Sequence, residues 1–504
     1  MEGDRNAQPR ERSTSASYGS MGTPGAEPGS VKLSGSRPFH ISPTRSYIAV
    51  AILFLINLLN NIDRYIIAGI LNDIQDYFKI NDSSAGLLQT VFMCSIMILA
   101  PLFGYLGDRY NRKILMCIGI FIWCIVTLAG SFITQSYFWL LIVCRAFASF
   151  GDASYSTIAP TIIADLFVGT KRTLMISIFW IASPVGSGLG YILGSGVMKL
   201  TGDWHWAMRV TPCMGLLALL LLIFLVPNPP RGASEGHMDS PHSRTSWLQD
   251  LKYLSKIRSF VLLVFSTAAV MFIIGALGFW GPLLLLRAQT TDGSSLRTAS
   301  NSQISLILGP ISCVTGIIGI GIAAMISKYF KKKNPRADPL ICAVGVLSSA
   351  PCLFIIIVLS RQCIATAYFF IFLGEIFLAL NFAITADILL GIVIPTRRSI
   401  AEAVQKCINH GLGEASSPYI IGAISDAIQK GRPKSNYGEF VSLEYAFLLC
   451  PFIAVVGGAL FLWTANYVEK DRMKASNQIE DSENQISVPR GQDSVAVPVG
   501  DVSS

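Results

Sequence analysis

The chain has 504 residues, of which 52% are hydrophobic and only 14% are charged. In soluble globular proteins roughly a quarter of all residues are charged, so the composition excludes a soluble fold. The net charge of +8 does not indicate nucleic-acid binding, because the basic residues lie in loops between long apolar segments.

Twelve apolar segments follow a polar amino-terminal region. Residues 1–45 are rich in Ser, Pro and Gly and are expected to form a disordered cytoplasmic tail. Runs of about 18 or more apolar residues with few charges are typical of membrane-spanning helices. We therefore expect an all-α membrane protein with twelve transmembrane helices, at residues 46–69, 84–106, 113–133, 138–162, 174–197, 208–227, 260–286, 304–329, 339–360, 364–391, 399–425 and 441–465.

A polar stretch divides these helices into six and six. Residues 228–259 contain Pro229, Pro230 and Gly232 and are expected to be a cytoplasmic linker. The linker separates an N-terminal bundle, residues 46–227, from a C-terminal bundle, residues 260–466. Residues 467–504 are expected to be a disordered cytoplasmic tail.

Basic residues concentrate in the loops on one side of this arrangement, although Lys430, Arg432 and Lys434 are an exception on the other. Cytoplasmic loops carry such an excess of Lys and Arg, so both termini are expected in the cytoplasm. The sequence does not choose between the plasma membrane and endosomal or lysosomal membranes, and we expect a monomer.

The two halves repeat one order of features, which is two acids, a basic pair and a helix rich in small residues. The features are Asp152, Asp165, Lys171–Arg172 and residues 186–196 in the first half, and Glu375, Asp387, Arg397–Arg398 and residues 411–422 in the second. Parallel repeats of six helices place a binding cavity between the halves near the membrane midplane. We therefore predict alternating access by rocking of the two halves.

Ionisable residues inside the first and fourth expected helices indicate a substrate site, because charge at membrane depth is costly. Asn57, Asn60 and Arg64 share one helix face, with Asp63 at its edge. Asn60 and Arg64 are candidate substrate contacts, and Asp63 is a candidate for charge balance or proton coupling. The alternative is an Asp63–Arg64 ion pair that only stabilises the bundle.

The fourth expected helix carries a second polar stripe, with Arg145 and Asp152 on the same face. A guanidinium can bind a phosphate or carboxylate through two hydrogen bonds, so Arg145 is a candidate substrate contact. Asp152 would balance its charge or carry a proton. A simple ion pair is the alternative.

Three further residues complete the candidate site. Glu375 lies near the middle of the tenth expected helix, and Arg287 ends the seventh, where it either reaches the cavity or extends to the interface. Both are candidate substrate contacts. His410 is a candidate for proton coupling, because histidine changes charge most readily near neutral pH; a packing role is the alternative.

No pattern indicates an enzyme, a metal site or a cofactor. The sequence has no phosphate-binding loop, no GxSxG and no HExxH, and its eleven cysteines show no metal-ligand spacing. Transport energy would then come from a gradient of ions or of the substrate.

The segment from Gly104 to Lys113, GYLGDRYNRK, resembles the cytoplasmic gating motif of the major facilitator superfamily. We expect Gly104, Asp108, Arg109 and Arg112 to form a cytoplasmic gate. Asp108 and Arg112 are expected to pair as i, i+4 neighbours on one helical turn.

Several longer segments together resemble the spinster family of that superfamily, over about residues 45–467. They are NLLNNIDRY from Asn57, ASYSTIAP from Ala153, PVGSGLGY from Pro184, GDWHW from Gly202, ADIL from Ala386 and VIPTRR from Val393. The linker segment from Val226 to Gly232 is most similar to the third vertebrate branch of the family, with the second as the alternative.

The resemblance implies transport of sphingosine-1-phosphate, other sphingoid lipids or lysophospholipids, and a polar cavity lined by Asp63, Arg64, Arg145, Arg287 and Glu375. Asp152 stands where the family usually has Glu, and Glu414 where Asp is usual. We expect a lipid transporter in the membrane, with direction and proton coupling left open. The alternatives are a carrier of a sugar or organic anion, and a non-transporting scaffold.

Overall fold

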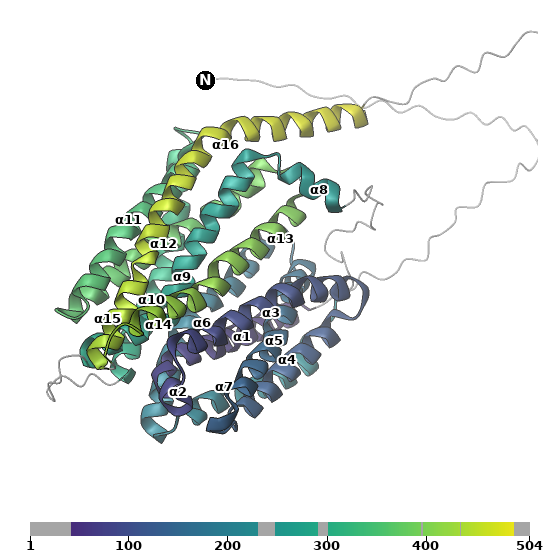
Figure 1. The fold of residues 1–504 in the computed structure, drawn as a ribbon. Coiled ribbons are helices and arrows are strands. Elements are labelled where there is room, and N and C mark those ends of the chain that lie inside the picture. Colours follow the sequence, from purple (N-terminus) through teal and green to yellow (C-terminus); the bar gives the residue numbers. More distant parts are fainter. Residues whose placement is uncertain (1–41, 230–246, 291–300, 395–396, 434, 488–504) are drawn as a thin grey trace, which may run out of the picture. The chain divides into compact units, whose positions relative to one another are not determined.

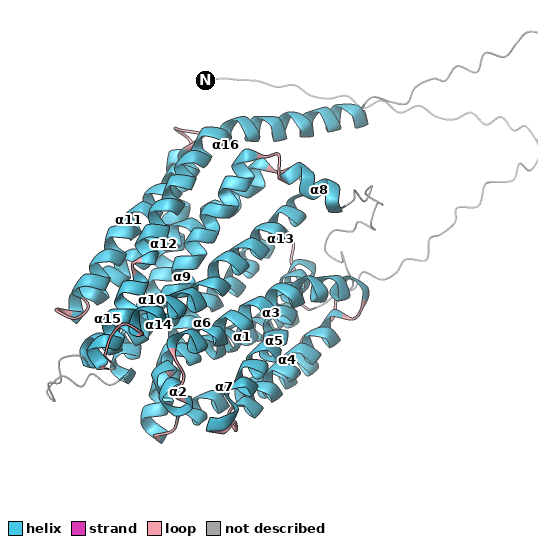
Figure 2. Cartoon of the chain, viewed as in Figure 1, coloured by secondary structure: helices cyan, strands magenta, loops and turns pink. Residues whose placement is uncertain are grey.

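The computed structural model describes residues 42–229, 247–290, 301–394, 397–433 and 435–487. In these residues the regular elements are all helices, as Figures 1 and 2 show. The first half contains α1 (Pro43–Gly69), α2 (Leu71–Phe78), α3 (Asp82–Arg109), α4 (Arg112–Gly130), η1 (Gln135–Tyr137), α5 (Phe138–Leu166), α6 (Gly169–Thr201) and α7 (Trp204–Leu225). The second half contains α8 (Trp247–Leu254), α9 (Arg258–Thr290), α10 (Asn301–Lys331), α11 (Ala337–Leu359), α12 (Ile364–Ile392), α13 (Arg398–Ile408), η3 (Asn409–Ala415), α14 (Ser416–Gln429), α15 (Asn436–Phe447) and α16 (Leu449–Ser487).

Each of the twelve predicted membrane helices has a counterpart. Among the described residues, ten helical segments are individually long and apolar enough to cross a membrane. The other two are α5, in which Arg145 and Asp152 lower the mean hydropathy, and the stack α13–η3–α14, which a π-helical segment divides. The prediction of an all-α membrane fold is confirmed.

The region after residue 466 differs from the expected disordered tail, because α16 continues as a helix to Ser487 (Figure 1). Its extension has partners on the second half. Asp471 accepts hydrogen bonds from the backbone N–H and hydroxyl of Ser259 at the start of α9, at 3.1 and 2.7 Å. Arg472 donates to Asp338 of α11 at 2.7 Å. The expected linker also contains a short helix, α8, while most of the expected tail 1–45 lies outside the described residues.

Two pairs of helices make the most extensive contacts between the two halves. α3 packs against α14, and α6 packs against α10. These are the second and eleventh, and the fifth and eighth, membrane helices. In two repeated halves, the second helix corresponds to the eighth and the fifth to the eleventh. The two contacts are therefore equivalent, as a repeat requires.

A second feature supports the repeat. Arg172 donates to the carbonyl of Phe167, the C-cap of α5, at 3.1 Å. Arg398 donates to the carbonyl of Val393, the C-cap of α12, also at 3.1 Å. Equivalent arginines of the two halves therefore close equivalent helix ends.

Glycine permits the closest contacts between the halves. A Cβ atom on Gly188 of α6 would lie 2.2 Å from the carbonyl oxygen of Gly309 on α10, and one on Gly86 of α3 would lie 2.3 Å from that of Pro418 on α14. Small residues allow such approach in lipid, where packing rather than hydrophobicity drives helix association.

Candidate functional site

The site is centred on η3, the π-helical segment Asn409–Ala415. π-Helical turns are rare and often mark functional sites. Gly413 lets this segment lie directly on α9, since a Cβ atom there would come within 2.6 Å of Met271 and 2.9 Å of the Ala268 carbonyl. The segment carries His410 and Glu414 toward the first half.

Arg64 of α1 and Glu414 of η3 form an ion pair between the two halves. Arg64 Nη2 lies 3.0 Å from Glu414 Oε2, and His410 Nδ1 lies 3.0 Å from the same oxygen. The Arg64 and Glu414 side chains are 14% and 11% exposed, whereas His410 is 36% exposed. The Nε of Arg64 is buried without a hydrogen-bond partner. We call Arg64, Glu414 and His410 the bridging cluster.

Asp63 is adjacent to Arg64 in sequence but points into a different environment. Its carboxylate pairs with Arg145 Nη1 at 3.3 Å and accepts hydrogen bonds from Trp123 Nε1 at 3.1 Å and Thr211 Oγ1 at 2.8 Å. These partners lie on α5, α4 and α7, so the network ties four helices of the first half. The Asp63–Arg64 pair considered from sequence is therefore not formed.

Arg145 is an interior residue of the first half. It is 2% exposed, and its guanidinium lies 4.6 Å from the centre of the Phe92 ring. Two of its nitrogens, Nε and Nη2, are buried without a partner. In this conformation Asp63 and Phe92 lie against the guanidinium, and direct contact of Arg145 with the substrate stays a prediction.

Asp152 is associated with the bridging cluster rather than with Arg145. Its carboxylate lies close enough to Arg64, His410 and Glu414 for their charges to act on it. The expectation that Asp152 balances Arg145 is therefore not what the structure shows.

Asn60 is buried, at 3% exposure, and its Nδ2 has no partner. It lies beside Gly151 of α5, where a Cβ atom would come within 3.2 Å of that nitrogen. One turn earlier, Asn57 donates to the Phe179 carbonyl of α6 at 2.7 Å and accepts from Tyr155 at 3.0 Å. Asn57 and Asn60 thus face α5 and α6 within the first half, whereas Arg64 of the same predicted stripe faces the second half.

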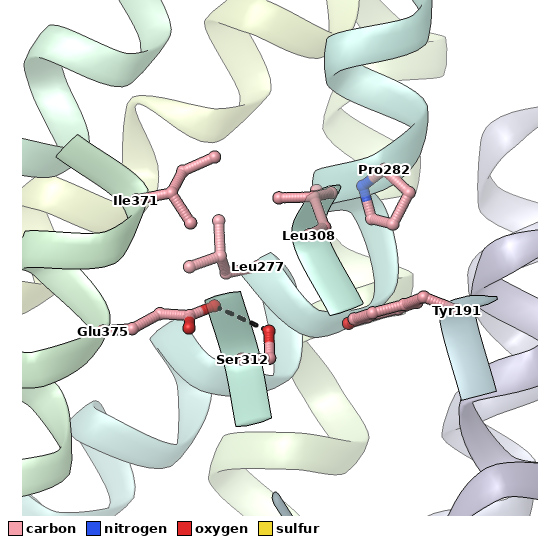
Figure 3. A pocket seen from close by; sticks show the side chains of 8 residues that line it. Tyr191, Leu277, Pro282, Leu308, Ser312, Ile371 and Glu375 are labelled. Carbon is pink, nitrogen blue, oxygen red and sulfur yellow. Dashed lines mark hydrogen bonds between the residues drawn. The ribbon is translucent and has the colours of Figure 1, made fainter. Parts of the chain in front are cut away.

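Glu375 of α12 lies in a pocket that both halves line (Figure 3). Its carboxylate accepts hydrogen bonds from Ser312 at 3.1 Å and Thr315 at 2.6 Å, both on α10. Tyr191 of α6 forms the opposite wall and donates to the Gly278 carbonyl at 2.6 Å. The free volume is about 10 Å³, enough for roughly one water molecule, so the pocket is closed to a lipid in this conformation.

Arg287 does not reach the bridging cluster but forms a second connection between the halves. Its Nη1 and Nη2 bind the two carboxylate oxygens of Asp82, at the start of α3, at 2.9 and 2.8 Å. Gln75 and Ser425 also donate to Asp82, at 2.8 and 2.7 Å. Asp426 of α14 accepts from the backbone N–H groups of Asp82 and Ser83 at 3.1 and 2.8 Å. We call this network the Asp82 latch.

The predicted gate is rearranged relative to expectation. Asp108 and Arg112 do not share a helical turn, because α3 ends at Arg109 and α4 begins at Arg112. Asn111 caps α4 by accepting from Lys113 and Ile114. Arg112 instead pairs with Asp165 of α5 at 2.5 Å.

The remaining residues of the expected gate are Gly104, Asp108 and Arg109. Arg109 is exposed and lies 4.3 Å from the Tyr105 ring centre. A Cβ atom added at Gly104 would meet nothing within 4 Å among the described residues, and the side chain of Asp108 lies outside the described part of the chain.

Sequence reasoning missed Asp82, Gln75, Ser425 and Asp426. Asp82 lies in the first turn of α3, where acidic residues are common for local reasons, and no local pattern singles out the other three. Sequence reasoning noted Glu414 as a position where the family usually has Asp, but did not include it among the candidate site residues. Within the described residues no group of His, Cys, Asp or Glu is arranged to hold a metal ion.

Residues 53–399 match the model of the Major Facilitator Superfamily. The protein named spinster homolog 1 of Xenopus laevis is 52% identical, over 92% of this chain and 90% of the relative. Spinster homolog 3 of Danio rerio is 53% identical, over 92% and 93%. The sphingosine-1-phosphate transporter SPNS2 of Danio rerio is 50% identical, over 88% of each chain. These similar values do not single out the third branch that the linker indicated.

Solved structures show the same fold. A bacterial homologue of the human lysosomal transporter Spinster, in an inward-facing and unoccupied conformation, superposes with a TM-score of 0.74 at 19% identity, covering 86% of this chain and 99% of that one. A D-xylose–proton symporter has a TM-score of 0.62 at 16% identity, covering 81% and 97%. With the family model and the relatives, these findings show that the chain is a multi-pass membrane protein of the spinster family in the major facilitator superfamily.

Proposed function

We propose that the chain carries a single-chain lipid with an anionic head, a sphingoid phosphate or a lysophospholipid, across the membrane by alternating access. The observation that carries this proposal is the Arg64–Glu414 ion pair, which joins the two halves through residues on α1 and η3. The name of the Danio rerio relative, a sphingosine-1-phosphate transporter at 50% identity, supports the substrate class.

The bridging cluster suits a charged head for two reasons. Arg64 binds Glu414 through Nη2, and its Nε has no partner among the described residues. An incoming phosphate that displaces Glu414 can therefore accept hydrogen bonds from both nitrogens. Guanidinium–phosphate contacts with two parallel hydrogen bonds are among the strongest in proteins. Exchange of Glu414 for phosphate would release η3 from α1 and so couple binding to movement of the halves.

The remaining candidate residues take supporting roles in this proposal. Asp63 and Arg145 hold α1 against α4, α5 and α7, and Asn60 packs beside them, so that the first half moves as one body. Glu375 contacts the substrate only after its closed pocket widens. Asp152 and His410 balance charge or accept a proton when Glu414 is released.

The Asp82 latch defines the proposed conformation. It holds α3 to α9 and α14 through Arg287, Ser425 and Asp426. At the opposite end of the bundle, Arg112–Asp165 lies within the first half and Arg397–Asp250 within the second. We infer that the Asp82 end is closed and, with both termini in the cytoplasm, faces the outside. Arg112 then belongs to the cytoplasmic gate, which would close when the latch opens.

Replacing Arg64 by Gln tests the headgroup site. Loss of a charge-assisted contact costs about 1.5–3 kcal/mol, so transport of labelled sphingosine-1-phosphate or lysophospholipid into proteoliposomes should fall by roughly tenfold or more. Arg45→Gln, an exposed arginine on the same helix, is the matched control and should retain transport. Equal rates for Arg64→Gln and the parent chain, at equal reconstitution, would remove Arg64 from the site. Transport of a sugar or organic anion but of no lipid would refute the substrate class.

If His410 couples transport to protons, its replacement should abolish the dependence of transport on a pH gradient. In proteoliposomes with an imposed pH difference, the parent chain should transport faster with the gradient than without it, because a protonated, positively charged His410 competes with Arg64 for Glu414 and so frees Arg64 for the headgroup. His410→Gln should transport at one rate under both conditions. A parent chain that ignores the gradient would show that transport is not proton-coupled.

The latch predicts a shift in accessibility. Ser312→Cys places a thiol in the closed Glu375 pocket, and adding Arg287→Gln should increase its labelling by a membrane-impermeant maleimide applied at the Asp82 end. The chain without the introduced cysteine corrects for the native thiols, of which Cys94, Cys213, Cys363 and Cys407 are exposed. Unchanged labelling would show that the Arg287–Asp82 bond does not keep this end closed.

A further inference from the structure

The end of α10 and the turn that joins it to α11 present five cationic side chains within nine residues. Lys328, Lys331, Lys332, Lys333 and Arg336 are all exposed. We call them the basic turn. They lie at the end of the bundle opposite the Asp82 latch, and the proposed transport path does not use them.

Only part of this charge is neutralised by the protein. Lys331 Nζ lies 3.3 Å from Asp338 and 3.6 Å from Asp387, and Arg336 pairs with Glu469 at 2.8 Å. For Lys328, Lys332 and Lys333, the structure shows no carboxylate within ion-pair distance among the residues it describes. The charges of Lys328, Lys332 and Lys333 therefore remain together without a carboxylate partner in the described part of the chain, while the ion pairs of Lys331 and Arg336 hold this region in place.

The last turns of α10 present apolar side chains beside this charge. Met325, Tyr329 and Phe330 are 66%, 57% and 47% exposed. Lys333 lies over the Tyr329 ring, 4.6 Å from its centre, and its Nζ is 3.0 Å from the Tyr329 hydroxyl. Aromatic residues at the end of a membrane helix lie at headgroup level, so the lysines are positioned where phosphate groups of the bilayer lie.

We propose that the basic turn binds the headgroup of an anionic phospholipid, with a polyphosphorylated inositol lipid bound more tightly than a singly charged one. Clusters of four or more Lys and Arg directly beyond a membrane helix bind such lipids, and each cation near the surface contributes to the affinity. The exposed Met325 and Phe330 would contact the acyl chains of the same lipid.

The bound lipid would act on the second half of the protein. Asp338, the buried acid that Lys331 contacts, also accepts from Ser327 of α10 and Arg472 of α16 at 2.8 and 2.7 Å. Arg336 connects the turn to α16 through Glu469. A headgroup on the turn therefore stabilises the contact of α10 and α11 with the extension of α16, and we expect it to raise the thermal midpoint of the protein.

The test uses the full chain in detergent, titrated with a short-chain phosphatidylinositol bisphosphate. The triple variant Lys328→Gln, Lys332→Gln and Lys333→Gln should bind this lipid at least about tenfold more weakly than the parent and lose the thermal shift. The matched control, Lys79→Gln, Lys199→Gln and Lys430→Gln, removes three exposed lysines near the Asp82 end and should behave as the parent. Raising the salt concentration should weaken binding to the parent.

Two outcomes would overturn the proposal. Equal affinity of the parent and the basic-turn triple variant would show that the lipid binds elsewhere. Equal affinity of the parent for soluble inositol trisphosphate and for the lipid would show a site for a free polyanion, in which the membrane takes no part.

Discussion

The arrangement depends on the cost of leaving a charge buried without a partner. Removing one member of a buried ion pair destabilises a protein by several kcal/mol, and Arg64 and Glu414 belong to different halves of the molecule. Whenever the halves separate at this level, each charge needs a new partner. For Arg64 that partner is an anionic headgroup, and for Glu414 it is His410, which already lies 3.0 Å away. The ion pair therefore links the occupancy of the site to the relative position of the halves.

Two adjacent residues of α1 perform opposite tasks. Successive side chains on a helix point about 100° apart, so Asp63 and Arg64 face different surroundings. Asp63 binds Arg145, Trp123 and Thr211 of its own half, whereas Arg64 binds the other half. The Asp63 network and the Arg64–Glu414 ion pair are thus adjacent on one helix. Because the network holds the helices of the first half together, breaking the ion pair would let the first half move as a unit. The Asp82 latch provides the matching contact at the closed end.

The sequence predicted what local physics determines. Hydropathy located all twelve membrane helices, and helical spacing placed Asn57, Asn60 and Arg64 on one stripe. It could not predict partners distant along the chain, such as Arg287 and Asp82, which are separated by 205 residues. It placed Arg145 in the cavity because charge at membrane depth usually marks a site, while the structure pairs Arg145 with Asp63 inside one half and leaves two of its nitrogens without a partner among the residues it describes. It expected a disordered end after residue 466 from polar composition, but Asp471 and Arg472 have partners on α9 and α11 that no local pattern reveals.

Equilibrium binding of the lipid to four purified chains tests the central claim most directly: the parent, Arg64→Gln, Glu414→Gln and the double variant. If headgroup and Glu414 compete for Arg64, removing the Glu414 charge leaves binding as tight as in the parent or tighter. Removing Arg64 then weakens it, and the double variant binds as weakly as Arg64→Gln alone. Binding that is unaffected by Arg64→Gln in both backgrounds would contradict the account.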